Sequence, residues 1–284
     1  MNYNLLKPIY DALGLAFPGT YMTILFFAFS LTFPIVAITA VRLKMPVWRQ
    51  ILFPIFVIPS ALIFSRVFHI LFEGMFMDYM HGLWENGIGY LFSEMLNPFK
   101  PGHVFYGGLF GGFLAGALMA IVNYPGDWAK FKKTADAAAI VVANGLWITR
   151  IGCFFEGCCF GRPSSIFGIH FPQGSKTMFM LYQIDPEHTS LFTETQPIIP
   201  TQLIHSGLNL IIFGVLIKLM FTGKEKKPGY IASIFLLSYS VARFMVEFLR
   251  YDIRGSFLFF STSQWISIIL FILGWKLYSK TKLT

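Results

Sequence analysis

The sequence predicts an all-α, polytopic membrane protein, and its composition is the first reason for this fold class. Hydrophobic residues make up 55% of the 284 residues and charged residues only 13%, with a mean hydropathy of +0.62. A soluble domain carries about 25% charged residues. The second reason is that apolar stretches of roughly 17 to 25 residues, long enough to cross a bilayer as helices, recur along the chain.

Seven apolar stretches predict seven transmembrane helices. The first lacks a preceding basic region and a small-residue cleavage site, so we expect a retained helix rather than a signal peptide. Prolines in the first two stretches fit membrane helices, since neighbouring helices supply partners for the freed carbonyl groups. No repeat or low-complexity linker interrupts the chain, so we expect a single domain over residues 1–284. In chain order the stretches are Tyr21–Val41, Ile51–Phe72, Phe105–Val122, Ala135–Ile151, Leu203–Phe221, Tyr230–Leu249 and Phe259–Leu277.

Basic residues cluster in alternate connections and at the C-terminus, which predicts the orientation. Cytoplasmic loops carry an excess of lysine and arginine, so we expect the N-terminus outside and the C-terminus inside, as an odd number of spans requires. The formal net charge is +8, but most of the lysines and arginines flank apolar stretches and do not form a basic face of a soluble domain. Nucleic-acid binding is therefore excluded. The clusters are Arg42, Lys44 and Arg49; Lys130, Lys132 and Lys133; Lys224, Lys226 and Lys227; and Lys276, Lys280 and Lys282.

Charged residues also occur at the outer ends of predicted helices, where they indicate a functional site. An ionised side chain within a bilayer costs about 2.5 kcal/mol or more, so such residues face the bundle interior. Arg243, Glu247 and Arg250 are spaced four and three apart, which places them on one helical face. With Arg66 and Arg150 they form either a structural ion ladder or an anion site. The excess of arginine favours the second, because guanidinium binds phosphate in a bidentate manner.

Glycines begin the third predicted helix. Gly108, Gly112 and Gly116 are spaced four apart, which predicts close approach of another helix. Gly107 and Gly108, which follow Tyr106 at the outer end, can also present backbone N–H groups to a phosphate.

These motifs together resemble those of the prolipoprotein diacylglyceryl transferases. The resemblance is carried by "GGLFGG" after Tyr106, by the spacing of Arg150, Gly152, Gly157 and Gly161, by "PTQL" from Pro200, and by "RFMVEFLR" followed by Asp252. It covers most of the chain in order. It implies seven helices in a bacterial inner membrane, with an active site open to the periplasm and the lipid.

The resemblance also implies a reaction. The diacylglyceryl group of phosphatidylglycerol would pass to the cysteine thiol of a prolipoprotein lipobox, with release of glycerol phosphate and no metal or soluble cofactor. By motif position, Arg150 and Arg243 would hold the phosphate, and Glu247 and Arg250 would complete the ion network. Gly152, Gly157 and Gly161 would shape the segment, and Tyr21 would match a tyrosine of the first helix. Arg66, Gly107 and Gly108 are further candidates for substrate binding.

The chain departs from the family pattern at three positions. Tyr106 stands where the family has histidine, although His103 lies three residues upstream, and either side chain could accept the proton of the acceptor. Cys153 and Cys158 replace an asparagine and a glutamate. A small thiol or amine acceptor is therefore an alternative, and a non-catalytic lipid-binding or lipid-translocating protein is another. The gathering of charges at one face favours an enzyme over a translocator.

The three cysteines, Cys153, Cys158 and Cys159, leave four interpretations open. A disulfide from Cys153 to either of the others could staple the turn in an oxidising compartment. Cys153 could instead be a nucleophile whose thiolate Arg150 stabilises. Metal binding, with His103, His170 or His205 as further ligands, and inert packing are the other two.

Overall fold

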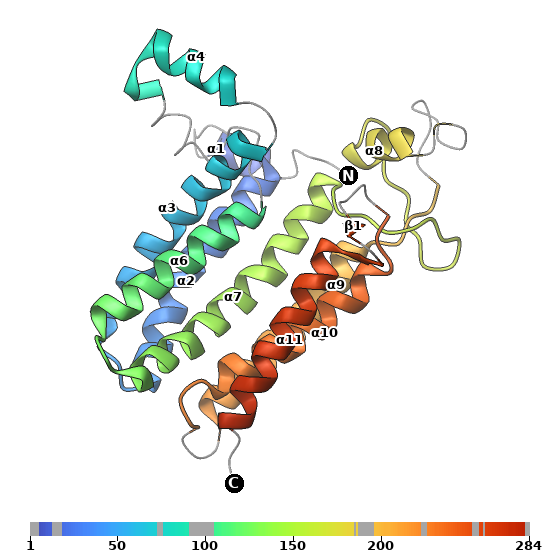
Figure 1. The fold of residues 1–284 in the computed structure, drawn as a ribbon. Helices are drawn as coiled ribbons and strands as arrows, with labels where there is room; N and C mark the ends of the chain where they lie inside the picture. The colour runs from blue at the N-terminus through green and yellow to red at the C-terminus, as the bar shows by residue number, and fades with distance from the viewer. Residues whose placement is uncertain are drawn as a thin grey trace. The chain divides into compact units, whose positions relative to one another are not determined.

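The computed structural model describes residues 6–12, 19–72, 76–90, 105–184, 186, 196–222, 226–251, 256–257 and 259–281. In these ranges the regular structure is helical, apart from one antiparallel hairpin of β1 (Ser256–Phe257) and β2 (Phe260–Ser261), and loops with isolated bridges connect the elements. Figure 1 shows the elements in chain order. The chain divides into two compact units: Met1–Ile35 with Ala135–Thr284, called unit 1, and Val36–Thr134, called unit 2.

A helix forms at each of the seven predicted stretches. These helices are α2 (Thr20–Arg42), α3 (Val47–Phe72), α6 (Phe105–Asn123), α7 (Trp128–Glu156), α9 (Thr201–Phe221), α10 (Tyr230–Glu247) and α11 (Thr262–Thr281). Among the described residues, three shorter helices were not predicted, namely α1 (Lys7–Ala12), α4 (Phe76–Asn86) and α8 (Lys176–Ile184). The longest difference is at α7, which begins seven residues before the predicted stretch because its polar first turns are also helical.

Five of the described helices are long and apolar enough to cross a membrane. They are Thr20–Arg42, Val47–Leu71, Trp128–Glu156, Thr201–Phe221 and Tyr230–Glu247, and the apolar helix Gly107–Asn123 is shorter. In helix α9, several polar side chains are buried and several apolar side chains are exposed, the opposite of the arrangement in a soluble protein. Its buried face carries Gln202, His205 and Asn209, whereas Ile211 and Val215 are exposed. A polar inner face with an apolar outer face suits a lipid solvent, and the chain is a multi-pass membrane protein.

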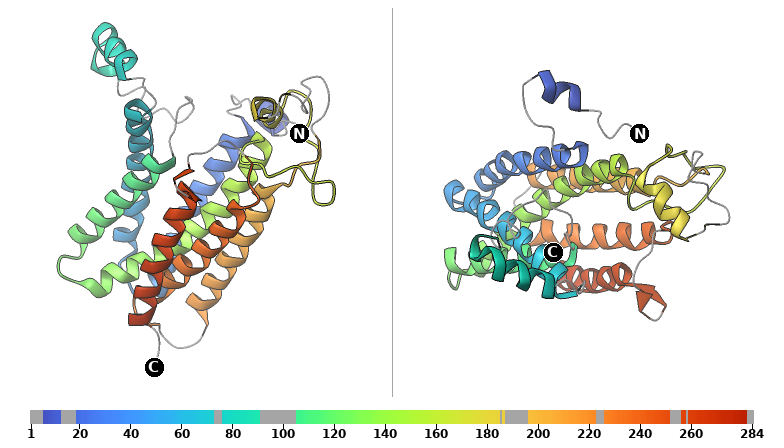
Figure 2. Two further views of the ribbon diagram at one scale, coloured as in Figure 1. Left: turned by 45° about the vertical axis from the view of Figure 1, so that its right-hand side comes forward. Right: turned by 90° about the horizontal axis from the view of Figure 1, so that it is seen from above.

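In unit 2, α3 and α6 pack along each other through glycine (Figure 2). A Cβ atom added at Gly107 would collide with the Phe64 carbonyl, and one at Gly111 would lie 2.7 Å from the Ser60 carbonyl oxygen. The predicted row of Gly108, Gly112 and Gly116 also faces α3, but at ordinary contact distances of 3.4 to 3.8 Å. The close helix approach therefore depends on the neighbouring row, Gly107 and Gly111.

Polar contacts connect two helix junctions of unit 2. Arg49, at the start of α3, donates to the Asn123 carbonyl at the end of α6 (2.9 Å), and Lys133 donates to the Leu43 carbonyl (3.1 Å). Buried Gln50 donates to the hydroxyl groups of Tyr124 and Thr134. The α2–α3 and α6–α7 junctions, each rich in basic residues, thus lie at the same end of this unit.

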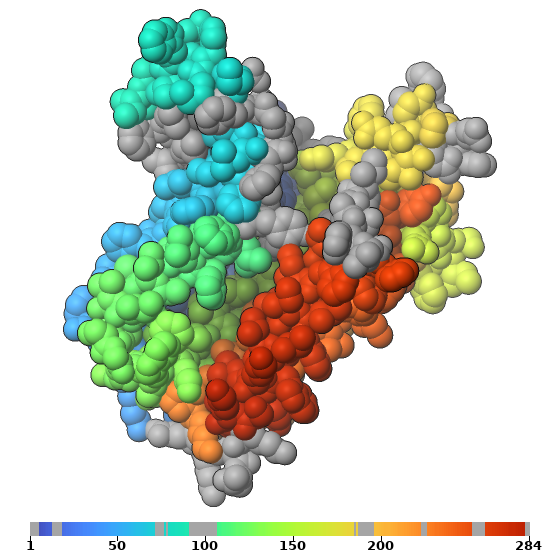
Figure 3. Space-filling view, viewed as in Figure 1, coloured from blue at the N-terminus to red at the C-terminus, as the bar shows by residue number. Residues whose placement is uncertain are grey.

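In unit 1, α10 packs against both α9 and α11, and Figure 3 shows α11 at the surface of the molecule. Buried Asp136 of α7 accepts hydrogen bonds from the backbone N–H groups of Gly229 (2.7 Å) and Ala232 (2.8 Å). This carboxylate satisfies donors at the α10 N-terminus that its own cap leaves unpaired. The α10 start thus lies beside the early turns of α7.

The opposite end of unit 1 is covered by the segment between α7 and α9. Its buried apolar cluster consists of Phe160, Phe171, Leu181 and Ile198. Isolated bridges join Gly161 to Arg250, and Ile198 to both Pro163 and Ile169. These backbone contacts fix the end of α7 against the ends of α9 and α10.

Candidate functional site

The site is built on the buried face of α10. Arg243 and Glu247 form an ion pair with an N···O distance of 3.0 Å. Arg243 also donates to the Ser263 hydroxyl (2.7 Å), and the Ser261 hydroxyl donates to Glu247 (2.9 Å). Both serines flank the start of α11. The α10 charges are therefore held in place by the α11 N-terminus as well as by each other.

Two further arginines converge on this pair. Arg150 comes from the last two turns of α7, and Arg250 follows the α10 C-terminus, where its backbone bridges to Gly161. The guanidinium groups of Arg150, Arg243 and Arg250 lie close enough to repel one another. Among the residues that the structure describes, Arg150 has no ion-pair partner and donates no side-chain hydrogen bond. Arg150 thus carries a positive charge that an anion would neutralise.

Buried polar groups of α9 and α10 lie next to the arginines. His205 is 1% exposed and stacks on Tyr239 with ring centroids 6.0 Å apart, and neither of its ring nitrogens has a hydrogen-bond partner in the described chain. Gln202 Oε1 and Asn209 Oδ1 are buried without partners too. Buried polar atoms are normally hydrogen-bonded, so unsatisfied ones call for an explanation such as a bound water or ligand.

Tyr239 and Ser263 belong to the site but were not among the candidates that the sequence pattern indicated. Tyr239 lies four residues before Arg243, and it interacts with both Arg150 and Arg243. The helical spacing of Tyr239, Arg243 and Glu247 was a signal that could have included it. Ser263 had no comparable signal, because its contact with Arg243 depends on the packing of α11 against α10.

The predicted glycines of unit 1 each have a steric reason. A Cβ at Gly152 would lie 2.9 Å from the Tyr21 ring, so the tyrosine of α2 lies directly against α7. Gly157 ends α7 with φ +71°, the left-handed region that favours glycine. Gly161 is surrounded by the Leu249 carbonyl oxygen (2.7 Å), Thr201 Cγ2 (2.7 Å) and the Ile199 carbonyl oxygen (2.8 Å), measured from an added Cβ.

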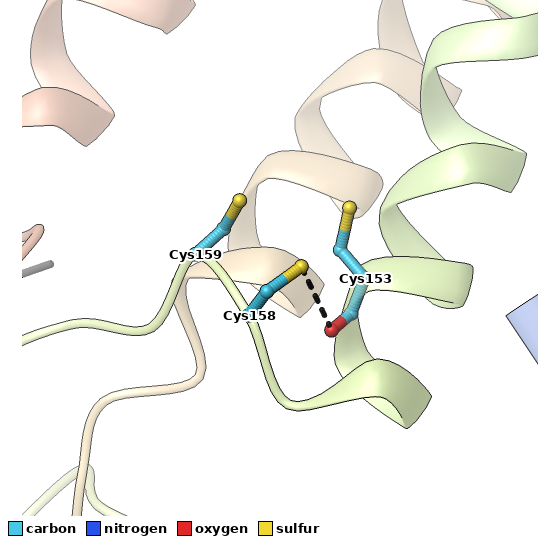
Figure 4. Close-up of side chains that lie close together, drawn as sticks. All are labelled: Cys153, Cys158 and Cys159. Carbon is cyan, nitrogen blue, oxygen red and sulfur yellow. Dashed lines mark hydrogen bonds between the residues drawn. The ribbon is translucent and has the colours of Figure 1, made fainter. Parts of the chain in front are cut away.

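The three cysteines lie together at the end of α7 (Figure 4). Their Sγ atoms are all within 4.8 Å of one another, and no disulfide joins them, so the disulfide that was one of the four interpretations is not formed in this structure. The Cys158 thiol donates to the Cys153 carbonyl, with an S···O distance of 3.8 Å. Hydrogen bonds from the Cys153 and Cys158 thiols, together with Arg250 and Arg150, lower the pKa of Cys159, which favours its thiolate.

The remaining predicted residues lie in unit 2 or outside the described chain. Arg66 is buried within α3, at 1% exposed, and Gly107 and Gly108 contact α3 from the first turns of α6. Tyr106 lies in the first turn of α6, and its side chain is outside the described part. His103 lies outside the described residues. The structure therefore brings together the candidates of unit 1, and it describes those of unit 2 separately.

A helical bundle with an apolar surface and three arginines gathered in a polar interior defines a multi-pass membrane protein with an anion-binding site. The sequence matches the family described as "Prolipoprotein diacylglyceryl transferase" over residues 18–279, and the chain belongs to this family. The matched range includes every predicted site residue.

Relatives of known name are similar over most of their length. A phosphatidylglycerol--prolipoprotein diacylglyceryl transferase 2 of Clostridium perfringens is 34% identical over 224 residues, 75% of this chain and 79% of the relative. Similar proteins named phosphatidylglycerol--prolipoprotein diacylglyceryl transferase occur in Clostridium tetani, at 33% identity over 64% of this chain and 65% of the relative, and in Idiomarina loihiensis, at 31% over 70% and 72%.

Proposed function

We propose that this protein transfers the diacylglyceryl group of phosphatidylglycerol to the cysteine thiol of a prolipoprotein, as the names of its relatives indicate for them. The observation that carries this proposal most directly is Arg150, a guanidinium group without an ion-pair partner in the described chain, beside Arg243 and Arg250. A phospholipid headgroup is the phosphate that a membrane supplies to such a cluster. The whole chain, residues 1–284, would act as one transferase domain.

The proposed reaction is a displacement at the carbon of the diacylglyceryl group that is bonded to the phosphate oxygen. The acceptor sulfur forms a bond to this carbon while the carbon–oxygen bond breaks, and glycerol phosphate leaves with the electron pair. Negative charge grows on the departing phosphate oxygen, where Arg150 and Arg243 would stabilise it more strongly than in the bound lipid. Glu247 would act as a positioning residue, since it holds Arg243 at 3.0 Å.

The acceptor thiol must lose its proton as the sulfur attacks. We assign this step to Tyr106, which stands where the family pattern has a histidine before the paired glycines Gly107 and Gly108, or to His103, three residues upstream. Arg66 of α3 would contribute a further positive charge to the headgroup. The Cys153 Sγ atom lies within 4.8 Å of those of Cys158 and Cys159, so we assign it with them rather than to the transfer step.

The function is tested with purified protein, labelled phosphatidylglycerol and a peptide that carries a lipobox. We expect labelled peptide and released glycerol phosphate in equal amounts. Release without labelling of the peptide would point to a different acceptor, such as a small thiol or amine. Binding of the lipid with neither product would contradict the enzymatic proposal and favour a lipid-binding protein.

We further propose seven crossings of the bacterial inner membrane, with the N-terminus outside and the C-terminus inside. Contacts within each unit support this orientation, because they place the basic junctions together. In unit 2, Arg49 and Lys133 bind backbone carbonyls at the same end. In unit 1, the Tyr230 and Tyr278 rings lie 6.0 Å apart, which brings the basic end of α11 beside the α10 start. The arginine cluster and the cysteines would then face the periplasm.

The orientation predicts which lysines react from outside intact cells. With a membrane-impermeant amine reagent, we expect modification of Lys176, whose side chain is 55% exposed in α8, and none of Lys226 before α10. Permeabilised cells, in which both lysines should react, provide the control. Modification of Lys226 in intact cells would overturn the proposed topology.

A further inference from the structure

The thiol cluster at the end of α7 belongs neither to the transfer step nor to the apolar packing of the outer segment. Cys153 lies in the last turn of α7, and Cys158 and Cys159 follow Gly157. The three Sγ atoms lie within 4.8 Å of one another, and none of them is joined to another. A disulfide needs two sulfurs about 2.05 Å apart and would leave the third thiol of this cluster unused.

The backbone that carries these thiols is held in place at three successive carbonyl groups. The Thr177 hydroxyl donates to Gly157, Gln202 Nε2 donates to Cys158, and the Thr201 hydroxyl donates to Cys159, each at 2.7 Å. All three donor residues are at most 1% exposed. The loop therefore does not need to reorganise to bring the thiols together, as a preformed ligand site requires.

Cys159 adds local strain to this arrangement. Its φ of 63° lies in the left-handed region, which is unfavourable for residues other than glycine. Such a conformation persists where the surrounding structure over-determines it, and it occurs most often at functional sites. Here it places the Cys159 thiol beside those of Cys153 and Cys158.

Three converging thiols match the coordination of a soft metal ion. With metal–sulfur distances of about 2.3 Å, the sulfurs of a trigonal or tetrahedral site lie roughly 4 Å apart, which small shifts within the present cluster would provide. Thiolate ligands select Cu(I), Zn(II) or iron–sulfur clusters. Among the described residues, no histidine or carboxylate joins the group, and Glu156 is paired with Lys176. A structural zinc site needs four protein ligands.

The number of ligands favours Cu(I) over Zn(II). Cu(I) prefers thiolate ligands, and the described residues bring three thiols together and no fourth ligand, whereas a structural zinc site needs four. We propose that Cys153, Cys158 and Cys159 form a three-thiolate site for a soft monovalent cation, namely Cu(I). This site lies beside the arginine cluster, and its existence does not depend on the proposed transferase activity.

The test offers Cu(I), as its bicinchoninate complex, to the protein purified in detergent without oxygen. We expect the wild-type chain to remove one equivalent of Cu(I) from the chelator and X-ray absorption to show sulfur ligands only. The matched control carries Cys153→Ser, Cys158→Ser and Cys159→Ser, retains all 12 methionines, and should lose that equivalent. Uptake equal to that of the control would overturn the proposal.

A second measurement needs no variant and so does not depend on how the triple substitution folds. One equivalent of Cu(I) should protect all three thiols of the wild-type chain from alkylation, as counted by mass spectrometry. Zn(II), offered in the same way, should protect them less, because only three ligands are in reach. Identical alkylation with and without Cu(I), or better protection by Zn(II), would contradict the assignment.

Discussion

Replacement of Arg150 by glutamine is expected to abolish most of the diacylglyceryl transfer while the protein remains folded. Arg150 has no ion-pair partner in the described chain, so its removal leaves no carboxylate unpaired. Loss of a group that stabilises the charge of the transition state typically lowers the turnover rate by about 10²–10³-fold. The measurement is the rate of peptide labelling from phosphatidylglycerol, with the retention of helix content by circular dichroism as a test of folding.

Two further variants test whether Arg150 acts through its position and planar geometry or only through its positive charge. Arg150→Lys keeps the positive charge but loses the planar, bidentate geometry for phosphate, so we expect only partial activity. Arg162→Gln removes an exposed arginine from the neighbouring segment and should transfer at the wild-type rate. If Arg150→Gln were as active as Arg162→Gln, Arg150 would not hold the phosphate.

Arg243 would behave differently, because its guanidinium group has a structural role as well. Its ion pair with Glu247 and its hydrogen bond to Ser263 hold α10 against the start of α11. Removing one partner of a buried pair leaves the other charge uncompensated, which is strongly destabilising. The ion ladder and the anion site that the sequence left as alternatives thus share Arg243, which pairs with Glu247 and lies beside Arg150, the guanidinium without an ion-pair partner in the described chain.

Local sequence patterns predicted the helices and the charged face of α10, because both follow from the regular geometry of the α-helix. The spacing of Arg243, Glu247 and Arg250 fixes a helical face, and the apolar stretches fix the helices. Tyr21 became a candidate through the family resemblance alone, since the first helix has little polar pattern, and its contact with Gly152 was not predicted. Helix packing selected Gly107 and Gly111 for the closest approach to α3, a choice that spacing could not make between two adjacent glycine rows.

The arrangement of the outer segment was not predictable from local patterns. Its bridges join Gly161 to Arg250 and Ile169 to Ile198, residues far apart in the sequence. Such pairings depend on the ends of three helices meeting, and no residue type in the sequence predicts them. The convergence of the three thiols has the same origin: Thr177, Thr201 and Gln202, on two later helices, fix the loop that carries two of them.

Gly161→Ala is expected to destabilise the outer segment where it meets the end of α10. The added Cβ would lie 2.7 Å from the Leu249 carbonyl oxygen and 2.8 Å from that of Ile199, and both belong to backbone that cannot rotate away. Overpacking of this kind costs about 1–3 kcal/mol. The Gly161–Arg250 bridge must open to relieve it, so we also expect slower transfer, because Arg250 would move relative to Arg150.

The measurement is the midpoint of thermal unfolding in detergent, for which we expect a decrease of several degrees in the Gly161→Ala variant. Gly207→Ala in α9 provides the matched control, because nothing lies within 4 Å of the position of its added Cβ. Alanine is favoured over glycine within a helix by about 1 kcal/mol, so this control should unfold at the same temperature or slightly higher. Equal unfolding midpoints for the two variants would show that the outer segment accommodates a methyl group at Gly161, and that the position of Arg250 does not depend on this bridge.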